Sequence, residues 1–424
     1  MSFVESPTLA TDKRIRARIA AGERVLHLAF GEAGLPVIPD AANALAAGAH
    51  LNSYGPVAGS EATRSAVAGY WNRRSLPTDP ESVILAPGSK AILYALLMAV
   101  PGDVILPQPS WVSYGAQALI AGHQAIWVPT LPEAGGIPDP ELLEATILSV
   151  QAEGRRPGCL IVTLPDNPTG TLAGRDLVEA VCGVADQHGI AVISDEIYRD
   201  LAYQPEMFYS PVNRLPERTV VTTGLSKSVA LGGWRIGAAR FPDSAWGRKL
   251  REDVVAIASE LWSSLAGPMQ AVAAHLFDEP ASVTEHIAAS RRLHGSVALA
   301  MYQLFLEAGA ECRTPQGAFY LYPDFAPLRV ELGKQGISSS ESLSDYLLRQ
   351  RGVAVLAGTA FGEDSSALRF RAASSLLYGK TDEQRWQALS SSQPCALPWI
   401  RDSLIQLTDA LAPLRAMSAT TGTA

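Results

Sequence analysis

Residues 222–227 read Thr-Thr-Gly-Leu-Ser-Lys, and eight residues after that lysine an arginine lies within Gly233-Trp234-Arg235-Ile236-Gly237. A lysine amine can condense with an aldehyde to a Schiff base, and an arginine can hold a phosphate through a two-pronged hydrogen bond. The flanking glycines let the backbone approach a ligand closely. The pair Lys227 and Arg235 is therefore what covalent capture of a phosphorylated aldehyde needs.

Three further motifs lie upstream in a workable order: Gly88-Ser89-Lys90, Asn167-Pro168-Thr169-Gly170 and Ser194-Asp195-Glu196-Ile197-Tyr198. With this ordered set the chain resembles the class I and II aminotransferases of fold type I, which use pyridoxal 5'-phosphate (PLP). The resemblance runs from about residue 28 to residue 377. It is specific for the cofactor and the fold, and much less specific for the substrate.

Short apolar runs alternate with helical patterns through the middle of the chain. We expect buried strands at 83–85, 104–106, 125–128, 159–162, 190–193 and 219–222, with helices such as 177–188 between them. Apolar strands that alternate with helices indicate a mostly parallel sheet covered on both faces. In such sheets the ligand binds beyond the carboxyl ends of the strands, and Asn167, Asp195 and Lys227 each follow a predicted strand.

A different pattern begins near residue 248 and indicates a smaller α+β domain. It predicts helices at 249–277, 283–308, 342–350 and 400–414, and strands at 318–322, 353–356 and 367–370. A chain of 424 residues is long enough for two domains. We expect an α/β fold with a large PLP-binding domain at 46–285 and a small domain at 286–424. The resemblance implies that the N-terminal segment 1–45 packs on the small domain.

The resemblance also implies a role for each residue around the cofactor ring. Lys227 would bind the cofactor and then move the Cα proton as general acid and base. Asp195 would keep the pyridine nitrogen protonated, Tyr198 and Asn167 would bond to the ring hydroxyl, and Trp111 would stack on the ring face. Without a ligand, Asp195 would instead be a helix N-cap, Asn167 an Asx turn and Trp111 a core residue.

The cofactor phosphate needs several donors. Gly88, Ser89 and Lys90 precede an apolar helical run at 91–100, and a turn that feeds a helix N-terminus offers free N–H groups and a positive dipole end. Arg235 would add a cation.

Two further points about the phosphate come from the resemblance. It implies that Tyr54 of the partner subunit reaches the same phosphate. Many family members carry a phosphate-binding serine three residues before the lysine, where this chain has Gly224. The missing hydroxyl would come from Ser226 or Thr223.

Two arginines, Arg369 and Arg371, are candidates for binding the α-carboxylate of an amino acid substrate. Alternation along a strand puts both on one face, and the resemblance favours Arg369. Gly31 matches a glycine near the substrate, with a plain turn as the alternative. Lys90 either meets a distal substrate carboxylate or lies on the surface.

Other classes of function are poorly supported. The net charge of −8 and pI near 5.5 argue against a nucleic-acid partner, and the longest apolar run, 91–100, cannot span a bilayer. Residues 1–10 do not resemble a secretory signal. The four cysteines have no metal-ligand spacing and suggest reduced thiols in the cytoplasm. There is no G-x-G-x-x-G, Walker A or H-E-x-x-H motif.

The sequence therefore predicts a PLP-dependent aminotransferase that moves an amino group from an L-α-amino acid to a 2-oxo acid by a ping-pong mechanism through a Lys227 Schiff base. We expect a cytoplasmic homodimer with shared active sites, no bound metal, and no nucleic-acid or membrane partner. The motifs do not fix the fate of the substrate carbanion, so a β- or γ-lyase or an amino acid oxidase or hydroxylase on the same scaffold is the first alternative. A ligand-sensing regulator is the second.

Overall fold

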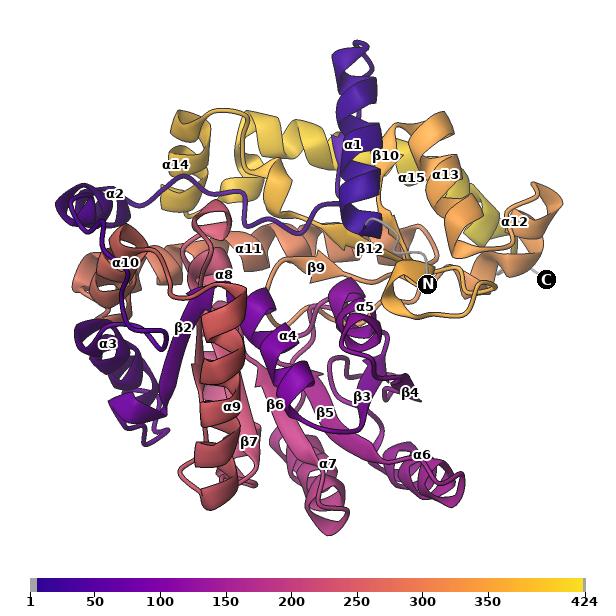
Figure 1. Cartoon of the computed structure of the whole chain (residues 1–424). Helices are drawn as coiled ribbons and strands as arrows, with labels where there is room; N and C mark the ends of the chain where they lie inside the picture. Colours follow the sequence, from indigo (N-terminus) through magenta and orange to yellow (C-terminus); the bar gives the residue numbers. More distant parts are fainter. Residues whose placement is uncertain (1–5, 422–424) are drawn as a thin grey trace.

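The computed structural model describes residues 6–421. The chain folds into a larger part around a seven-stranded sheet and a smaller part with two short sheets, and the long helix α11 (Ala281–Glu307) lies between them (Figure 1).

The large sheet has the strand order β2-β8-β7-β6-β5-β3-β4. Its strands are β2 (Val83–Pro87), β3 (Asp103–Gln108), β4 (Ala125–Pro129), β5 (Pro157–Thr163), β6 (Ala191–Asp195), β7 (Thr219–Gly224) and β8 (Ile236–Arg240). Only β8 runs antiparallel to its neighbours, so the predicted α/β fold with a mostly parallel sheet is confirmed. Strand β8 was not predicted, because its Ile-Gly-Ala-Ala-Arg sequence has a single β-branched residue, Ile236, and no aromatic residue to favour a strand.

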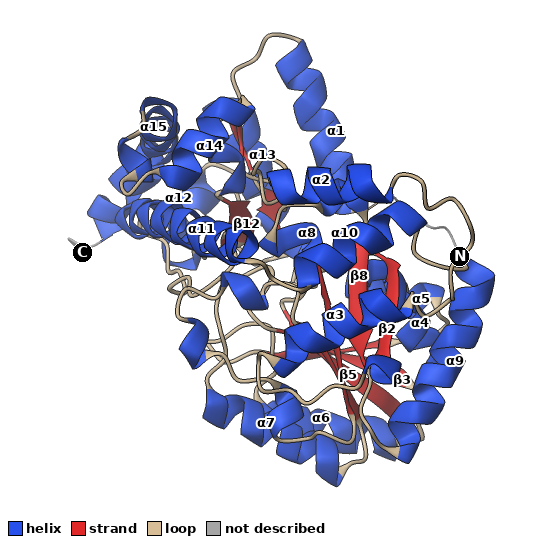
Figure 2. Ribbon diagram, turned by 90° about the vertical axis from the view of Figure 1, so that its left-hand side faces the viewer, coloured by secondary structure: helices blue, strands red, loops and turns tan. Residues whose placement is uncertain are grey.

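Helices cover both faces of this sheet, which explains its continuous apolar strands (Figure 2). They are α3 (Glu61–Asn72), α4 (Ser89–Ala99), α5 (Val112–Ile120), α6 (Pro140–Ala152), α7 (Arg175–Gln187), the one-turn α8 (Leu225–Ser228), α9 (Ala245–Leu261) and α10 (Gly267–Phe277). Along β5, Leu160 and Val162 pack in one core cluster with α6 and α7, whereas Ile161 packs in another with α4 and α9.

One predicted helix is divided in the structure. The pattern at 249–277 suggested a single helix, but α9 ends at Leu261 and α10 begins at Gly267. Between them Ser263 adopts a left-handed conformation with φ 61°, and Pro268 occupies the first turn of α10. A left-handed residue ends a helix, and a proline is best tolerated near a helix start.

The smaller part contains a three-stranded sheet, β11-β12-β9, and a two-stranded pair, β1-β10. Its strands are β1 (Leu26–His27), β9 (Tyr320–Leu321), β10 (Val353–Ala354), β11 (Leu356–Ala357) and β12 (Phe370–Ala373). Around them lie α1 (Pro7–Ala20), α12 (Arg329–Lys334), α13 (Ser340–Arg351), α14 (Asp382–Ser390) and α15 (Pro398–Thr421), while α2 (Pro39–Gly48) packs on α10. The domain limits stay a prediction, because α11 runs unbroken across residue 286.

The topology gathers the motifs at one edge of the large sheet. Strands β2, β3, β5, β6 and β7 all end there, and the antiparallel β8 begins there. Each of the predicted motifs lies at one of these strand ends, so residues far apart in the sequence meet at this edge.

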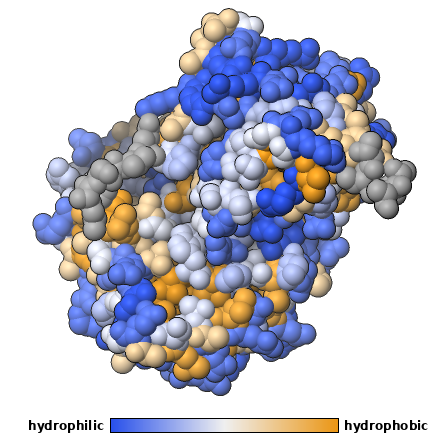
Figure 3. All heavy atoms as spheres, turned by 90° about the vertical axis from the view of Figure 1, so that its right-hand side faces the viewer, coloured by the Kyte–Doolittle hydropathy of each residue, from blue (hydrophilic) through white to orange (hydrophobic). Residues whose placement is uncertain are grey.

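The surface seen in Figure 3 is largely hydrophilic, with apolar residues in separate patches. Among residues 6–421, no helix has the length and apolar character needed to cross a membrane.

Candidate active site

A cavity of about 550 Å³ lies at the carboxyl edge of the sheet. Residues of the N-terminal segment and of the small part complete its walls. The predicted site residues that line it are Gly31, Ser89, Lys90, Trp111, Asn167, Asp195, Tyr198, Ser226, Lys227 and Arg235. The structure therefore brings most of the predicted site together, and places Arg369 and Tyr54 outside it.

Lys227 lies on α8, directly after β7, with a partly buried side chain. Its Nζ donates a hydrogen bond of 2.6 Å to the carbonyl oxygen of Gly31. Burial, reinforced by the nearby cations Arg371 and Arg235, lowers the pKa of Lys227 to about 8, although Glu32 opposes this shift. With this pKa roughly a tenth of the amine is uncharged at pH 7, far more than for an ordinary lysine, and can act as a nucleophile.

Asp195 ends β6 and is only 3% exposed. Its Oδ2 accepts a hydrogen bond from Tyr114 Oη (2.8 Å), and its Oδ1 accepts one from Thr222 Oγ1 (3.1 Å). Burial raises the pKa of Asp195 to about 6. Two hydroxyl donors thus hold a carboxylate that burial destabilises, and a cationic ligand group beside it would favour its charged form.

Tyr198 is joined to the opposite wall of the cavity by a second tyrosine. The hydroxyls of Tyr198 and Tyr320 share a hydrogen bond of 2.7 Å, and Tyr320 Oη also donates to the Gly31 carbonyl at 3.4 Å. A Cβ at position 31 would lie 2.6 Å from Tyr320 Oη. The cavity therefore requires glycine here, because the Gly31 carbonyl must approach both Lys227 and Tyr320.

Arg371 is the arginine that faces the cavity. It is 2% exposed, and it donates to Asn167 Oδ1 (3.0 Å) through Nη1 and to the Ala29 carbonyl (2.7 Å) through Nη2. Its Nε has no hydrogen-bond partner. Within residues 6–421 no carboxylate forms an ion pair with it, so a buried cation lines the cavity without an anion of its own.

Arg369, the arginine that the resemblance favours for the substrate carboxylate, lies outside the cavity. Its Nε donates to Asp324 Oδ2 (2.7 Å) and its Nη1 donates to Glu363 Oε1 (3.0 Å), and its side chain is 40% exposed. Strand β12 begins only at Phe370, so Arg369 precedes the strand. Its guanidinium is already neutralised by two carboxylates, whereas the hydrogen-bond acceptors of Arg371 are neutral.

The residues predicted to bind the phosphate meet where β2 and β8 are paired. Gly88 has φ 85° and precedes α4, and a Cβ there would lie 2.2 Å from Nη2 of Arg235. Likewise a Cβ at Gly237 would lie 2.2 Å from the backbone nitrogen of Ser89. The two glycines thus let the guanidinium pack against the first turn of α4, whose leading N–H groups have no acceptor within the helix. This combination is suited to an anion.

The glycine that departs from the family pattern has a structural reason. A Cβ at Gly224 would lie 2.6 Å from the Ile236 carbonyl oxygen, because β7 and β8 are paired there. Of the two alternative hydroxyls, Ser226 lines the cavity and Thr223 does not.

Trp111 and Lys90 line the same side of the cavity. The ring of Trp111 meets that of Tyr114 edge to face, with centroids 5.2 Å apart, and Lys90 Nζ lies 5.0 Å from the centroid of Trp111. Burial, together with Arg235, lowers the pKa of Lys90.

The cavity-lining residues that were missed from the sequence include two tyrosines, Tyr114 and Tyr320. Tyr114 lies one helical turn after Trp111, which offered a weak local signal. Tyr320 lies in the predicted strand 318–322, where nothing in the sequence distinguishes it from a core residue.

The donor set fits a planar, phosphorylated ring. The anion site lies at β2 and β8, the lysine follows β7, and the buried Asp195 ends β6, two strands from β8 and thus roughly 10 Å along the sheet. A phosphate would meet Arg235, and a ring cation would meet Asp195.

Comparison with known proteins agrees with this geometry. Residues 23–376 match the family described as Aminotransferase class I and II. The chain belongs to this family. The aminotransferase is 35% identical to a probable aspartate/prephenate aminotransferase of Thermus aquaticus over 73% of its own length and 76% of the relative's. It is 33% identical to the aspartate/prephenate aminotransferase of Cereibacter sphaeroides, over 84% and 89% of the two chains.

The fold is also that of solved relatives. The structure of Thermus thermophilus aspartate aminotransferase with maleate superposes with a TM-score of 0.81 at 26% identity, covering 96% of this chain and 97% of the other. This protein is therefore a PLP-dependent aminotransferase of fold type I.

Proposed function

We propose that this aminotransferase takes a dicarboxylic L-amino acid as amino donor. The observation that carries this proposal is the pair of cations in one cavity: Arg371 lacks a counterion, and Lys90 lines the same cavity. A dicarboxylic substrate would neutralise both. The names of relatives, which include aspartate/prephenate and aspartate aminotransferases, support the same substrate class.

Each wall of the cavity has a distinct task in this proposal. When bound, PLP supplies the electron sink that stabilises negative charge at the substrate Cα. Arg371 binds the α-carboxylate through its fork, with Asn167 fixing the guanidinium. Lys227, with its lowered pKa, takes the proton from Cα and returns it elsewhere on the bound molecule. The Gly31 carbonyl orients the Lys227 amine.

Asp195 keeps the pyridine nitrogen protonated, because a buried carboxylate gains most from a cation beside it. Tyr114 and Thr222 orient its two oxygens, while Tyr198 donates to the ring hydroxyl. Arg235, Ser89, Ser226 and the start of α4 hold the phosphate, and Trp111 covers the ring face.

The substrate class is tested with Lys90→Met, which keeps the length of the side chain and removes its charge. We expect kcat/KM for aspartate to fall about tenfold to a hundredfold, because one charge-assisted contact is lost. The value for alanine, which has no distal carboxylate, should change less than about threefold in the same assay. An equal loss for both donors would show that Lys90 does not select the substrate.

We further propose a homodimer in which Tyr54 completes the partner's phosphate site. Tyr54 is 93% exposed, yet its loop is anchored, since the Ser60 N–H donates to Gln270 Oε1 at 2.7 Å. A Cβ at Gly55 would lie 3.0 Å from Nε2 of the same glutamine. A large aromatic side chain held outward on an anchored loop is typical of a contact with another chain.

Subunit mixing tests the shared site. In a heterodimer of Tyr54→Phe and Lys227→Ala chains, one site carries both changes and the other carries neither. An equal mixture should therefore recover about a quarter of the wild-type activity after exchange. No recovery despite exchange, shown by mass spectrometry, would contradict the shared site, provided that the Tyr54→Phe homodimer is impaired.

We also propose that the enzyme works in the cytoplasm. Its four cysteines, Cys159, Cys182, Cys312 and Cys395, are all free thiols, which suits a reducing compartment. Fractionation of the source cells with an antibody to the chain would test this.

A further inference from the structure

The six residues Asp195-Glu196-Ile197-Tyr198-Arg199-Asp200 form a turn with two faces. Asp195, Ile197 and Tyr198 line the cavity, whereas Glu196, Arg199 and Asp200 bind groups on the far side. The backbone is tightly wound, since Arg199 N–H donates to the Glu196 carbonyl (3.0 Å) and Leu201 N–H to the Tyr198 carbonyl (2.8 Å). Residues three apart in such a turn share a side, so Glu196 and Arg199 lie together on the far side.

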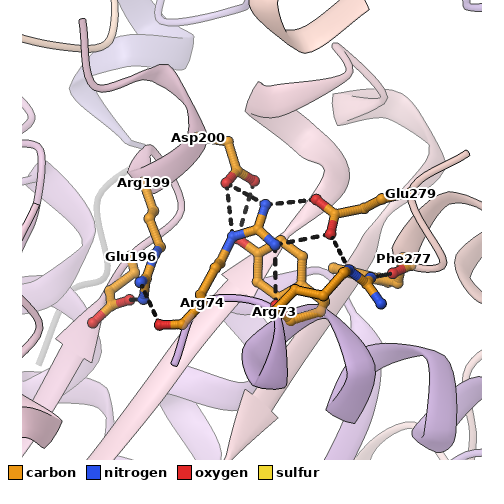
Figure 4. A network of polar contacts seen from close by, with 8 residues as sticks. Arg73, Arg74, Glu196, Arg199, Asp200, Phe277 and Glu279 are labelled. Atoms are coloured by element: carbon orange, nitrogen blue, oxygen red, sulfur yellow. Dashed lines mark hydrogen bonds and ion pairs between the residues drawn. The ribbon is translucent and has the colours of Figure 1, made fainter. Parts of the chain in front are cut away.

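The far side of this turn is held by arginine–carboxylate contacts, shown in Figure 4. Glu196 has no exposed side-chain surface, and its Oε2 accepts from Arg199 Nη1 at 2.8 Å. Its Oε1 accepts from the hydroxyls of Ser194 and Ser210. Asp200, which follows Arg199 in the turn, is bound by Arg74, a residue from outside the turn.

Arg74, just beyond α3, anchors Asp200 from outside the turn. Its Nε and Nη2 donate to Asp200 Oδ1 at 3.1 and 2.8 Å. Its Nη1 and Nη2 also donate to the two carboxylate oxygens of Glu279, at 2.9 and 2.5 Å. Tyr70 Oη donates to the other Asp200 oxygen at 3.0 Å. Every nitrogen of the Arg74 side chain is thus engaged, which fixes its planar fork.

The charges of this network balance. It comprises three arginines, Arg73, Arg74 and Arg199, and three carboxylates, Glu196, Asp200 and Glu279. No charge is left over for a ligand, and the network does not line the cavity. Its connection to function is therefore through the turn that it holds.

We propose that Arg74 is a positioning residue for the reaction: by fixing Asp200 it holds the turn so that Asp195 and Tyr198 keep their places in the cavity. Catalytic groups on a turn need such support from a second layer of fixed side chains. The inference rests on the proposed roles of Asp195 and Tyr198.

Arg73 provides a matched control. It is the adjacent arginine and donates to the same Glu279, with an Nε–Oε2 distance of 2.7 Å, but it makes no contact with Asp200. Arg74→Met and Arg73→Met therefore both remove an ion pair with Glu279, and only the first releases the turn.

We expect Arg74→Met to lower kcat about tenfold while KM for the amino donor changes less than about threefold, because Arg371 still binds the carboxylate. The absorbance band of the bound cofactor changes with pH, and the midpoint of this change should rise by about one pH unit. The reason is that Tyr198 becomes misaligned and no longer donates properly to the ring hydroxyl. In the cofactor-free protein, backbone amides of residues 196–201 should exchange hydrogen faster. Arg73→Met should leave these three quantities near their wild-type values.

Asp200→Asn tests the same link with a smaller change, should Arg74→Met fail to fold. It keeps an oxygen that Arg74 can bind and removes the charge, so we expect the same direction with a smaller effect. If Arg74→Met folds and matches Arg73→Met in kcat, absorbance midpoint and exchange, or if Asp200→Asn leaves all three unchanged, the positioning role is wrong.

The hydrogen-exchange measurement separates this failure from failure of the proposed function, because it needs no cofactor. Faster exchange without any change in kcat or absorbance would show that the turn is anchored by Arg74 but that Asp195 and Tyr198 do not have their proposed roles, which overturns both. If the wild-type enzyme behaves as the proposed function requires, and Arg74→Met changes neither kcat, nor the absorbance midpoint, nor hydrogen exchange, only the inference about Arg74 is wrong.

Discussion

The cavity and the arginine–carboxylate network are two charged regions that differ in balance. In the network each arginine is matched by a carboxylate. In the cavity the four cations Lys90, Lys227, Arg235 and Arg371 outnumber the two acids Asp195 and Glu32. Since an unpaired buried charge is costly, the balanced region is suited to holding structure. The unbalanced one is suited to a ligand that brings the missing negative charge.

The same contrast distinguishes two arginines only two residues apart. Arg369 is bound by Asp324 and Glu363, whereas Arg371 has only neutral acceptors, Asn167 and a carbonyl. Charge balance, and not position along the strand, indicates which arginine is available to a substrate.

The largest effect should come from Lys227→Ala. Two described lysines line the cavity, Lys90 and Lys227, and the change removes the more buried of the two amines. We expect kcat to fall on the order of 10⁶-fold, as when other covalent catalysts lose their nucleophile. The measurement is turnover together with borohydride trapping of the cofactor on the chain. Trapping at wild-type yield would show that another lysine carries the cofactor.

Asp195→Asn should have the next largest effect on catalysis. An amide cannot keep the pyridine nitrogen protonated, so we expect kcat to fall about 10³-fold, equal to about 4 kcal/mol of barrier. Cofactor binding, measured by fluorescence titration, should persist. Activity within about tenfold of wild type would exclude this role for Asp195.

How far the sequence could predict this site depends on how each residue is held. Lys227, Asp195 and Asn167 belong to local motifs at strand ends, so their meeting follows from a parallel sheet. The choice between Arg369 and Arg371 depends on carboxylates at positions 324 and 363, which no local pattern connects to this strand. Tyr320 faces the cavity through the packing of the small part, and Arg74 reaches Asp200 across 126 residues of sequence. Such contacts depend on tertiary structure and leave no local signal.

Arg371→Lys sharpens the comparison between the two arginines, with Arg369→Lys as its matched control. A lysine keeps the charge and loses the two-pronged hydrogen bond, so we expect Arg371→Lys to lower kcat/KM for the amino donor about 10²-fold, mainly through KM. Because Arg369 lies outside the cavity, Arg369→Lys should change kcat/KM less than about threefold. Steady-state kinetics of both variants gives the answer, and the reverse order would restore Arg369 as the clamp.

The smallest effect concerns the free energy of unfolding of the cofactor-free protein. Two changes, Asp195→Asn in the cavity and Asp200→Asn in the network, test the charge balance of the two regions directly. The folded-state pKa of Asp195 is about 6, above its ordinary value of 3.8, because burial opposes its charge. Between about pH 4 and pH 6 the folded cofactor-free protein holds a proton that the unfolded chain has released, so stability falls as pH rises through this window. The two-unit shift corresponds to at most about 3 kcal/mol above pH 6. Asparagine has no proton to lose, so Asp195→Asn should make the cofactor-free protein more stable than wild type by about 1–3 kcal/mol at pH 8. This gain should disappear near pH 4.

Asp200→Asn should act in the opposite direction, because it leaves Arg74 with one carboxylate in place of two. We expect it to lower stability by about 2 kcal/mol at pH 8. Lys227, whose pKa is lowered to about 8, adds a rise in stability mainly above pH 8, outside the pH range compared. Urea unfolding at pH 4, 5, 6 and 8 measures both changes. If both variants are destabilised at pH 8, other groups of the chain already compensate the negative charge of Asp195. The contrast between the two regions then fails.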